Sequence, residues 1–146
     1  MFATLFGIGT AHADPSYQEV LLVEVFTTTD WEVQRESVAG TNKAHKDIDV
    51  QSYELDGIQR FEAQLSSNLP TDPGQSKHIA LQRIQQLDEQ VTSAIQNAAI
   101  GLAKAMQYGV DRYPAIVFDG AVVVYGLTDL SAAADHYQTW QTENRP

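Results

Sequence analysis

Residues 111–127 are the most informative part of the sequence for the fold. They read Asp-Arg-Tyr-Pro-Ala-Ile-Val-Phe-Asp-Gly-Ala-Val-Val-Val-Tyr-Gly-Leu. Two short apolar runs, 115–118 and 121–125, have the composition of buried strands. Asp119-Gly120 separates them, and both of these positions tolerate the positive φ angles of a tight hairpin. Pro114 stands at the entry of the first run, a place that suits a residue without a backbone N–H. The pattern therefore predicts a proline, a strand, a two-residue turn and a second strand.

The residues on either side of this hairpin extend the prediction. The Tyr113-Pro114 bond is a candidate for a cis peptide, because such bonds are almost confined to X-Pro pairs. Gly126 breaks the second apolar run, and Thr128-Asp129 then predicts the N-cap and first turn of a closing helix over residues 128–140. The polar residues 142–146 are expected to form a flexible tail.

Two more strands are predicted before the hairpin. Residues 19–27 are almost continuously apolar, which is typical of a central strand buried on both faces. Residues 48–55 alternate between apolar and polar, which predicts a half-buried strand. Thr29 and Glu32 have the spacing of a capping box, so a short helix is expected to begin near Asp30.

Helices are predicted over residues 57–67, where Asp56 can serve as the N-cap, and over residues 73–108. Asp72, Pro73 and Gln75 supply the second helix with an N-cap, an N1 proline and a capping-box partner, and Gly109 is a suitable residue to end it. The second helix carries one apolar stripe, which we expect to pack against the sheet rather than in a coiled coil. The stripe consists of Ile79, Ala80, Ile84, Leu87, Val91, Ile95, Ala98, Leu102 and Met106.

Length, charge and the N-terminus limit the class of protein. The 146 residues fit one domain, and the net charge of −10 argues against direct binding to nucleic acid or to anionic lipid. Ala11-His12-Ala13 follows a short apolar segment, as at the end of a secretory signal peptide. Residues 1–13 are therefore expected to be removed, leaving a soluble, exported domain over residues 14–141. No segment reaches the ~20 apolar residues of a membrane span.

The residues that usually carry chemistry are scarce. The chain has no cysteine, which excludes a disulfide, a thiol nucleophile and a cysteine-ligated metal. The histidines do not stand at metal-ligand spacing, and there is no phosphate-binding loop or nucleophile elbow. We therefore expect no metal, no cofactor and no enzyme activity.

The order of predicted elements resembles a thioredoxin-like domain. Residues 26–34, Phe-Thr-Thr-Thr-Asp-Trp-Glu-Val-Gln, are similar to the strand end that leads into a redox Cys-x-x-Cys, with Trp31 and Gln34 at the cysteine positions. Neither residue can supply the thiolate that this chemistry needs. The resemblance implies an α/β three-layer sandwich with a central four-stranded mixed sheet. The helical segment between its second and third strands would be enlarged.

Most of the chain also resembles the thioredoxin-like proteins encoded in integrating conjugative elements of Gram-negative bacteria. The similar stretches are residues 23–28, 53–60, 101–106, 109–120 and 124–129. The resemblance implies a periplasmic accessory component of a conjugative type IV secretion system. Its partners would be other proteins of the conjugation machinery, and no enzyme activity is established for the family.

The candidate site is the groove that would form if Tyr113-Pro114 lies opposite the end of the first strand. Its predicted residues are Thr28, Thr29, Asp30, Trp31, Arg112, Tyr113 and Pro114. Exposed aromatic side chains there would favour protein binding. In the alternative, Trp31 plugs the vacated redox site and Tyr113 packs in the core. Two other functions stay open: a glutathione-transferase-type enzyme that uses Thr27 or Thr28 to orient a thiol, and a periplasmic chaperone that uses the same groove.

Overall fold

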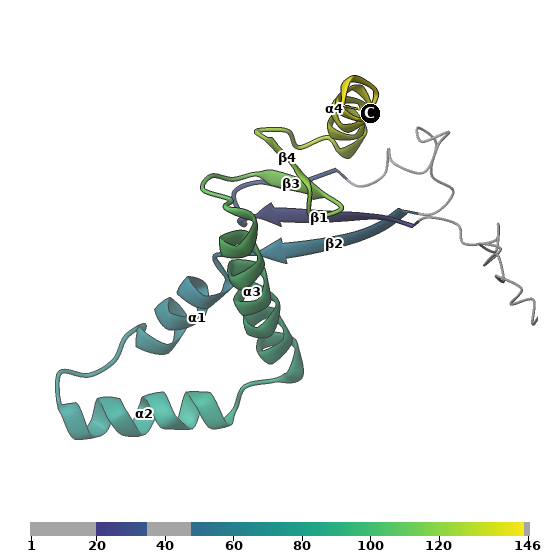
Figure 1. The fold of residues 1–146 in the computed structure, drawn as a ribbon. Coiled ribbons are helices and arrows are strands. Elements are labelled where there is room, and N and C mark those ends of the chain that lie inside the picture. Colours follow the sequence, from purple (N-terminus) through teal and green to yellow (C-terminus); the bar gives the residue numbers. More distant parts are fainter. Residues whose placement is uncertain (1–19, 35–47, 145–146) are drawn as a thin grey trace, which may run out of the picture.

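The computed structural model describes residues 20–34 and 48–144 and shows a mixed α/β fold (Figure 1). The predicted signal peptide lies outside the described residues. The strands are β1 (Leu21–Thr27), β2 (Ile48–Glu54), β3 (Ala115–Phe118) and β4 (Val122–Tyr125). The helices are α1 (Gly57–Ser66), α2 (Pro73–Gln85), α3 (Glu89–Tyr108) and α4 (Leu130–Glu143).

The strands form one mixed sheet in the order β2-β1-β3-β4. β1 runs parallel to β2 and antiparallel to β3, and β3 runs antiparallel to β4. α4 covers one face of the sheet and α3 the other (Figure 1). On the α4 side, Val23 and Val25 of β1 join the core that includes Phe118 and Tyr137. Phe26 belongs to the core on the α3 side, so β1 is buried on both faces, as its apolar run predicts.

The hairpin that the sequence predicts at Asp119-Gly120 is confirmed. Both residues have positive φ angles, 49° and 65°. The backbone N–H of Leu22 donates to the Asp119 carboxylate over 2.9 Å, and the hydroxyl of Tyr137 donates to the other carboxylate oxygen over 3.1 Å. Asp119 thus does more than turn the chain, because it also joins the start of β1 to α4.

The prediction of one helix over residues 73–108 is wrong, since the segment forms α2 and α3 with a break between them. The carboxylate of Asp88 accepts a hydrogen bond from the N–H of Val91 over 2.8 Å and so caps a new helix. The expected packing of the apolar stripe on the sheet holds only for part of α3, where Leu102 packs against the core that includes Phe26, whereas Met106 is largely exposed.

The other predicted helix ends agree with the structure in part. Asp72 caps α2 by accepting from the N–H of Gln75, and Gly109 ends α3 in the left-handed conformation. The N-cap of α4 lies one residue later than predicted, since Asp129, rather than Thr128, accepts from the N–H of Ser131 and the helix begins at Leu130. α4 then continues to Glu143, into the segment expected as a tail.

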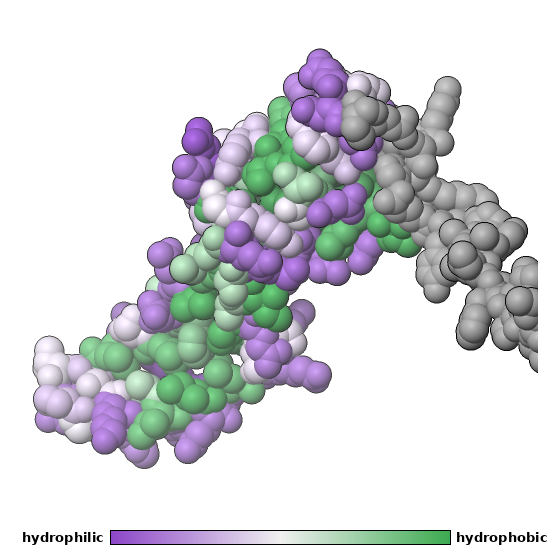
Figure 2. Space-filling model, viewed as in Figure 1, coloured by the Kyte–Doolittle hydropathy of each residue, from purple (hydrophilic) through white to green (hydrophobic). Residues whose placement is uncertain are grey.

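α1 and α2 form an arm that extends from the sheet (Figure 1). None of the residues of α2 is buried, and hydrophobic side chains are visible on the surface of the arm (Figure 2). The guanidinium of Arg83 donates to the carbonyl oxygens of Leu65 over 2.7 Å and of Ser67 over 2.8 Å, which ties α2 to the C-terminal end of α1. A cavity of about 380 Å³ lies beside this contact, between α1 and the break that precedes α3.

Candidate functional site

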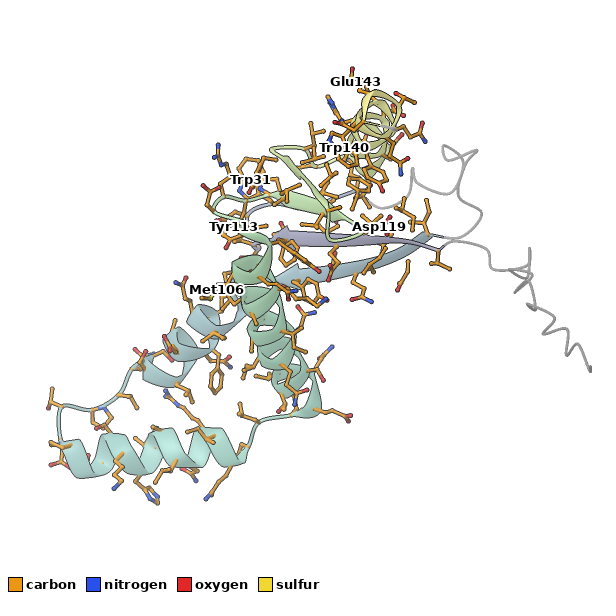
Figure 3. All side chains as sticks on the ribbon, viewed as in Figure 1. Trp31, Met106, Tyr113, Asp119, Trp140 and Glu143 are labelled. Carbon is orange, nitrogen blue, oxygen red and sulfur yellow. The ribbon has the colours of Figure 1, made fainter. Side chains whose placement is uncertain are left out.

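The candidate site lies where β1 ends and β3 begins. Phe26 pairs with Ala115 in the antiparallel register of these strands. The next residues outward, Thr27 and Pro114, therefore lie at the same end of the sheet. The Tyr113-Pro114 peptide bond is cis, as the sequence suggests. Figure 3 shows Trp31 and Tyr113 at this end, so the fold brings the two predicted segments together.

The segment after β1 is a tight turn rather than the predicted helix. The N–H of Trp31 donates to the carbonyl of Thr28 over 3.0 Å, and the hydroxyl of Thr27 donates to the carbonyl of Trp31 over 2.6 Å. The described residues that follow, up to Gln34, are not helical. The expected helix start near Asp30 is wrong because these local hydrogen bonds hold the chain in a different conformation.

Asp56, in the connection between β2 and α1, anchors this turn. Both the backbone N–H and the hydroxyl of Thr29 donate to the Asp56 carboxylate, the N–H over 3.2 Å. The expected N-cap contact of Asp56 to α1 is therefore not made. Burial alone would raise the pKa of Asp56, but the hydrogen bonds from Thr29 and the charge of Arg60 outweigh it and lower the pKa below the ordinary 3.8.

Replacing Asp56 with alanine is expected to lower the free energy of unfolding at pH 7 by about 2 kcal/mol, since charged hydrogen bonds to Thr29 are lost. The folded pKa of Asp56 is depressed, so its contribution is present above the ordinary pKa and is lost as the pH falls through the folded pKa. Urea unfolding should therefore show the wild type and the variant converging in acid. Asp135→Ala, which removes an exposed carboxylate from α4, is the control, and an equal loss in both variants would contradict the anchoring role.

Trp31 and Tyr113 are both accessible to a partner. Their exposed fractions are 50% and 37%. Tyr113 is therefore not packed in the core as the alternative interpretation required, and half of the Trp31 side chain faces solvent. Gln34, at the second position that resembles a redox cysteine, donates its backbone N–H to the carbonyl of Thr128 over 2.8 Å. Trp31 and Gln34, which the sequence predicts at redox-cysteine positions, therefore differ: Trp31 presents an indole ring to solvent, and Gln34 ties the chain to the start of α4.

The loop before β3 is fixed on its inner side and open on its outer side. Pro114 is buried, and its carbonyl accepts from the N–H of Gly126 over 3.0 Å. The guanidinium of Arg112 lies 4.9 Å from the centre of the Tyr125 ring and 3.0 Å from the Asp111 carboxylate, whose pKa it lowers by hydrogen bonding and charge. Within the part of the chain that the structure describes, no backbone hydrogen bond joins Tyr113 to another residue. Its N–H and C=O can therefore pair with an added segment.

A buried ionic cluster was not predicted from the sequence. Glu24, in the middle of β1, is fully buried, and its carboxylate lies 2.5 Å from the ammonium of Lys104. The hydroxyl of Tyr108 donates to the same carboxylate over 2.6 Å, and that of Tyr53 over 3.4 Å. A signal was present: a glutamate inside an apolar run needs a buried partner, and Lys104 and Tyr108 are four residues apart on one helix face.

The protonation of the side chains around Glu24 agrees with a structural role for this cluster. The hydrogen bond to Glu24 raises the pKa of Lys104 and that of Tyr108, while burial is the main reason that the pKa of Tyr53 is raised. At neutral pH the cluster thus holds an ammonium group and two neutral phenols around the carboxylate. These contacts join α3 to the central strand, on the face opposite α4.

The described residues contain neither a metal-ligand cluster nor a membrane-spanning helix. Over residues 20–34 and 48–144, no group of three His, Cys, Asp or Glu side chains could hold a metal ion. His78 on α2 and His136 on α4 are both exposed. None of the described helices combines the length and the apolar content needed to cross a bilayer.

The protein thus has a mixed α/β fold, with the exposed aromatic residues Trp31 and Tyr113 beside a cis-proline loop. The chain belongs to DUF1525, a family of proteins of unknown function, whose family pattern covers residues 22–143. No curated protein and no solved structure matches the chain.

Proposed function

We propose that this chain is an exported, redox-inactive, thioredoxin-like component of a conjugative type IV secretion apparatus that acts by binding other proteins. The observation that carries the proposal is the position of Trp31 and Tyr113. Both side chains are exposed, and the register of β1 and β3 puts their loops at one end of the sheet. Aromatic residues in such a position are typical of protein interfaces.

The arrangement of the sheet supports a thioredoxin-like topology. The order β2-β1-β3-β4 combines one parallel and two antiparallel pairs, and helices cover both faces. α1, α2 and α3 all lie between β2 and β3 in the chain, which agrees with an enlarged helical insertion there. Two of the stretches that resemble the conjugative-element proteins, residues 109–120 and 124–129, contain the Tyr113 loop and the strands behind it.

Protein binding accounts for the site better than thiol chemistry. The chain has no cysteine, and an indole and an amide stand at the positions that resemble the redox pair. The transferase alternative relied on Thr27 or Thr28. The hydroxyl of Thr27 is already committed to the carbonyl of Trp31, over 2.6 Å, which counts against its orienting a substrate thiol.

A pull-down from the periplasm of a donor strain tests the proposal. The tagged wild type should retain proteins of the conjugation machinery. Trp31→Ala should retain at least about tenfold less of them, because an interface aromatic residue typically contributes ~1.4 kcal/mol or more to binding. Trp140→Ala is a matched control, because Trp140 is a tryptophan of similar exposure, 41%, on α4. Equal losses from both variants, or the retention of no conjugation protein, would contradict the proposal.

A further inference from the structure

The charges around the strand-end surface are unbalanced. The surface is formed by the described residues of the turn after β1, by the end of β2 together with the start of α1 that follows it, and by the loop before β3. Carboxylates outnumber cations on these segments. The acidic residues are Asp30, Glu32, Glu54, Asp56 and Asp111, and the basic residues are Arg60 and Arg112.

Both cations are already paired within the protein. Arg112 lies 3.0 Å from the carboxylate of Asp111, and its guanidinium also covers the ring of Tyr125. Arg60 lies 2.8 Å from the carboxylate of Glu54 and 3.5 Å from that of Asp56. Each guanidinium therefore already has a carboxylate partner on this surface.

Two carboxylates beside Trp31 have no such partner in the part of the chain that the structure describes. Asp30 and Glu32 precede and follow Trp31 in the chain, and all three residues are exposed. Among the ion pairs of the described residues, none includes Asp30 or Glu32. An exposed indole between two unpaired carboxylates attracts a cation in two ways, by charge and through the face of the ring.

On the basis of the proposed function, we propose that this surface recognises an extended protein segment that carries a lysine or arginine beside an apolar residue. The cationic side chain lies against Trp31, between Asp30 and Glu32. The apolar residue contacts Tyr113, whose backbone groups make no backbone hydrogen bond to the described residues and can pair with the segment. Acidic segments are rejected, because they would place like charges against carboxylates that form no ion pair within residues 20–34 and 48–144.

The purified protein and synthetic peptides of about 12 residues, long enough to cross a sheet end, test this specificity. The peptides share an extended apolar core and differ at one flanking position, which is Lys, Ala or Glu. Fluorescence anisotropy should give a Kd about tenfold lower for Lys than for Ala, and weaker binding still for Glu. Because the attraction is electrostatic, the preference for Lys should shrink between about 25 mM and about 300 mM NaCl.

Variants of the two carboxylates separate this inference from the proposed function. Asp30→Asn with Glu32→Gln should reduce the preference for Lys over Ala to about twofold, consistent with losing two nearby charges. Since both side chains are exposed, urea unfolding should confirm an unchanged stability. Binding that requires Trp31 but ignores the flanking charge would overturn the inference and leave the proposed function standing. Binding that survives Trp31→Ala, or no binding of any peptide, would contradict both.

Discussion

Lys104→Met is expected to lower the free energy of unfolding by about 3–5 kcal/mol, because it leaves the carboxylate of Glu24 buried without its cation. Glu24 is fully buried, and the ammonium of Lys104 lies 2.5 Å from it. The two phenols that remain, Tyr53 and Tyr108, donate hydrogen bonds but carry no charge. Urea unfolding followed by circular dichroism at pH 7 measures the loss.

The matched control is Lys77→Met, which removes an exposed lysine from α2 and should change the stability by less than about 0.5 kcal/mol. A double variant, Glu24→Leu with Lys104→Met, removes both charges and should recover much of the loss, since apolar replacements of buried pairs are often neutral. If Lys104→Met costs no more than its control, Glu24 is not held as a buried anion.

The pH dependence of the same pair follows from the raised pKa of Lys104. A raised folded pKa gives a stabilisation that is fully present below the ordinary value of 10.5 and is lost as the pH rises through the folded pKa. The difference between the wild type and Lys104→Met should therefore stay constant from neutral pH to about pH 9, and decrease only in stronger alkali.

Gly101→Val is expected to lower the free energy of unfolding by about 3 kcal/mol, through overpacking between α3 and β2. A Cβ atom at Gly101 would lie 2.7 Å from Cδ2 of Leu55 and 2.9 Å from Cγ of Tyr53. The absence of a side chain lets the helix approach this strand closely, so a larger residue forces α3 away from the sheet. The same shift would disturb the contact between Lys104 and Glu24.

A glycine of the arm provides the control for this substitution. A Cβ atom at Gly74, in the first turn of α2, would approach only the Asp72 carboxylate, at 3.4 Å. Gly74→Val should therefore stay within about 0.5 kcal/mol of the wild type in the same urea titration. Similar losses at both glycines would show that the cost does not come from the close packing of α3 on β2, since valine has a better helix propensity than glycine.

Local signals in the sequence predict local structure well in this protein. The Asp119-Gly120 turn, the Asp72 cap of α2 and the left-handed Gly109 each depend on residues close in the chain, and all are found. The break before α3 was missed because the apolar stripe continues through it with helical spacing. The stripe records which residues are apolar, but it does not record that Asp88 caps a helix of its own.

The parts that could not be predicted depend on contacts between distant residues. Asp56 has the position of an N-cap, yet its carboxylate binds Thr29 on a different loop. Glu24 stands 80 residues before Lys104 in the chain. Its burial is explained only by the packing of α3 on the sheet, which brings Lys104 to the Glu24 carboxylate. For the site, Trp31 and Tyr113 were predicted from the resemblance to thioredoxin-like domains. The register of β1 and β3 then shows that their two loops lie at the same end of the sheet.

The central claim is that a partner protein docks at the strand-end surface around Trp31 and Tyr113. Site-specific photocrosslinking in donor cells tests it most directly, with the photoreactive residue at position 31, at position 140 on α4, or at position 81 on the exposed face of α2. We expect a discrete crosslinked protein from position 31, identified by mass spectrometry as a conjugation component, and none from positions 140 or 81. Crosslinks from position 140 or 81 with none from position 31 would contradict it.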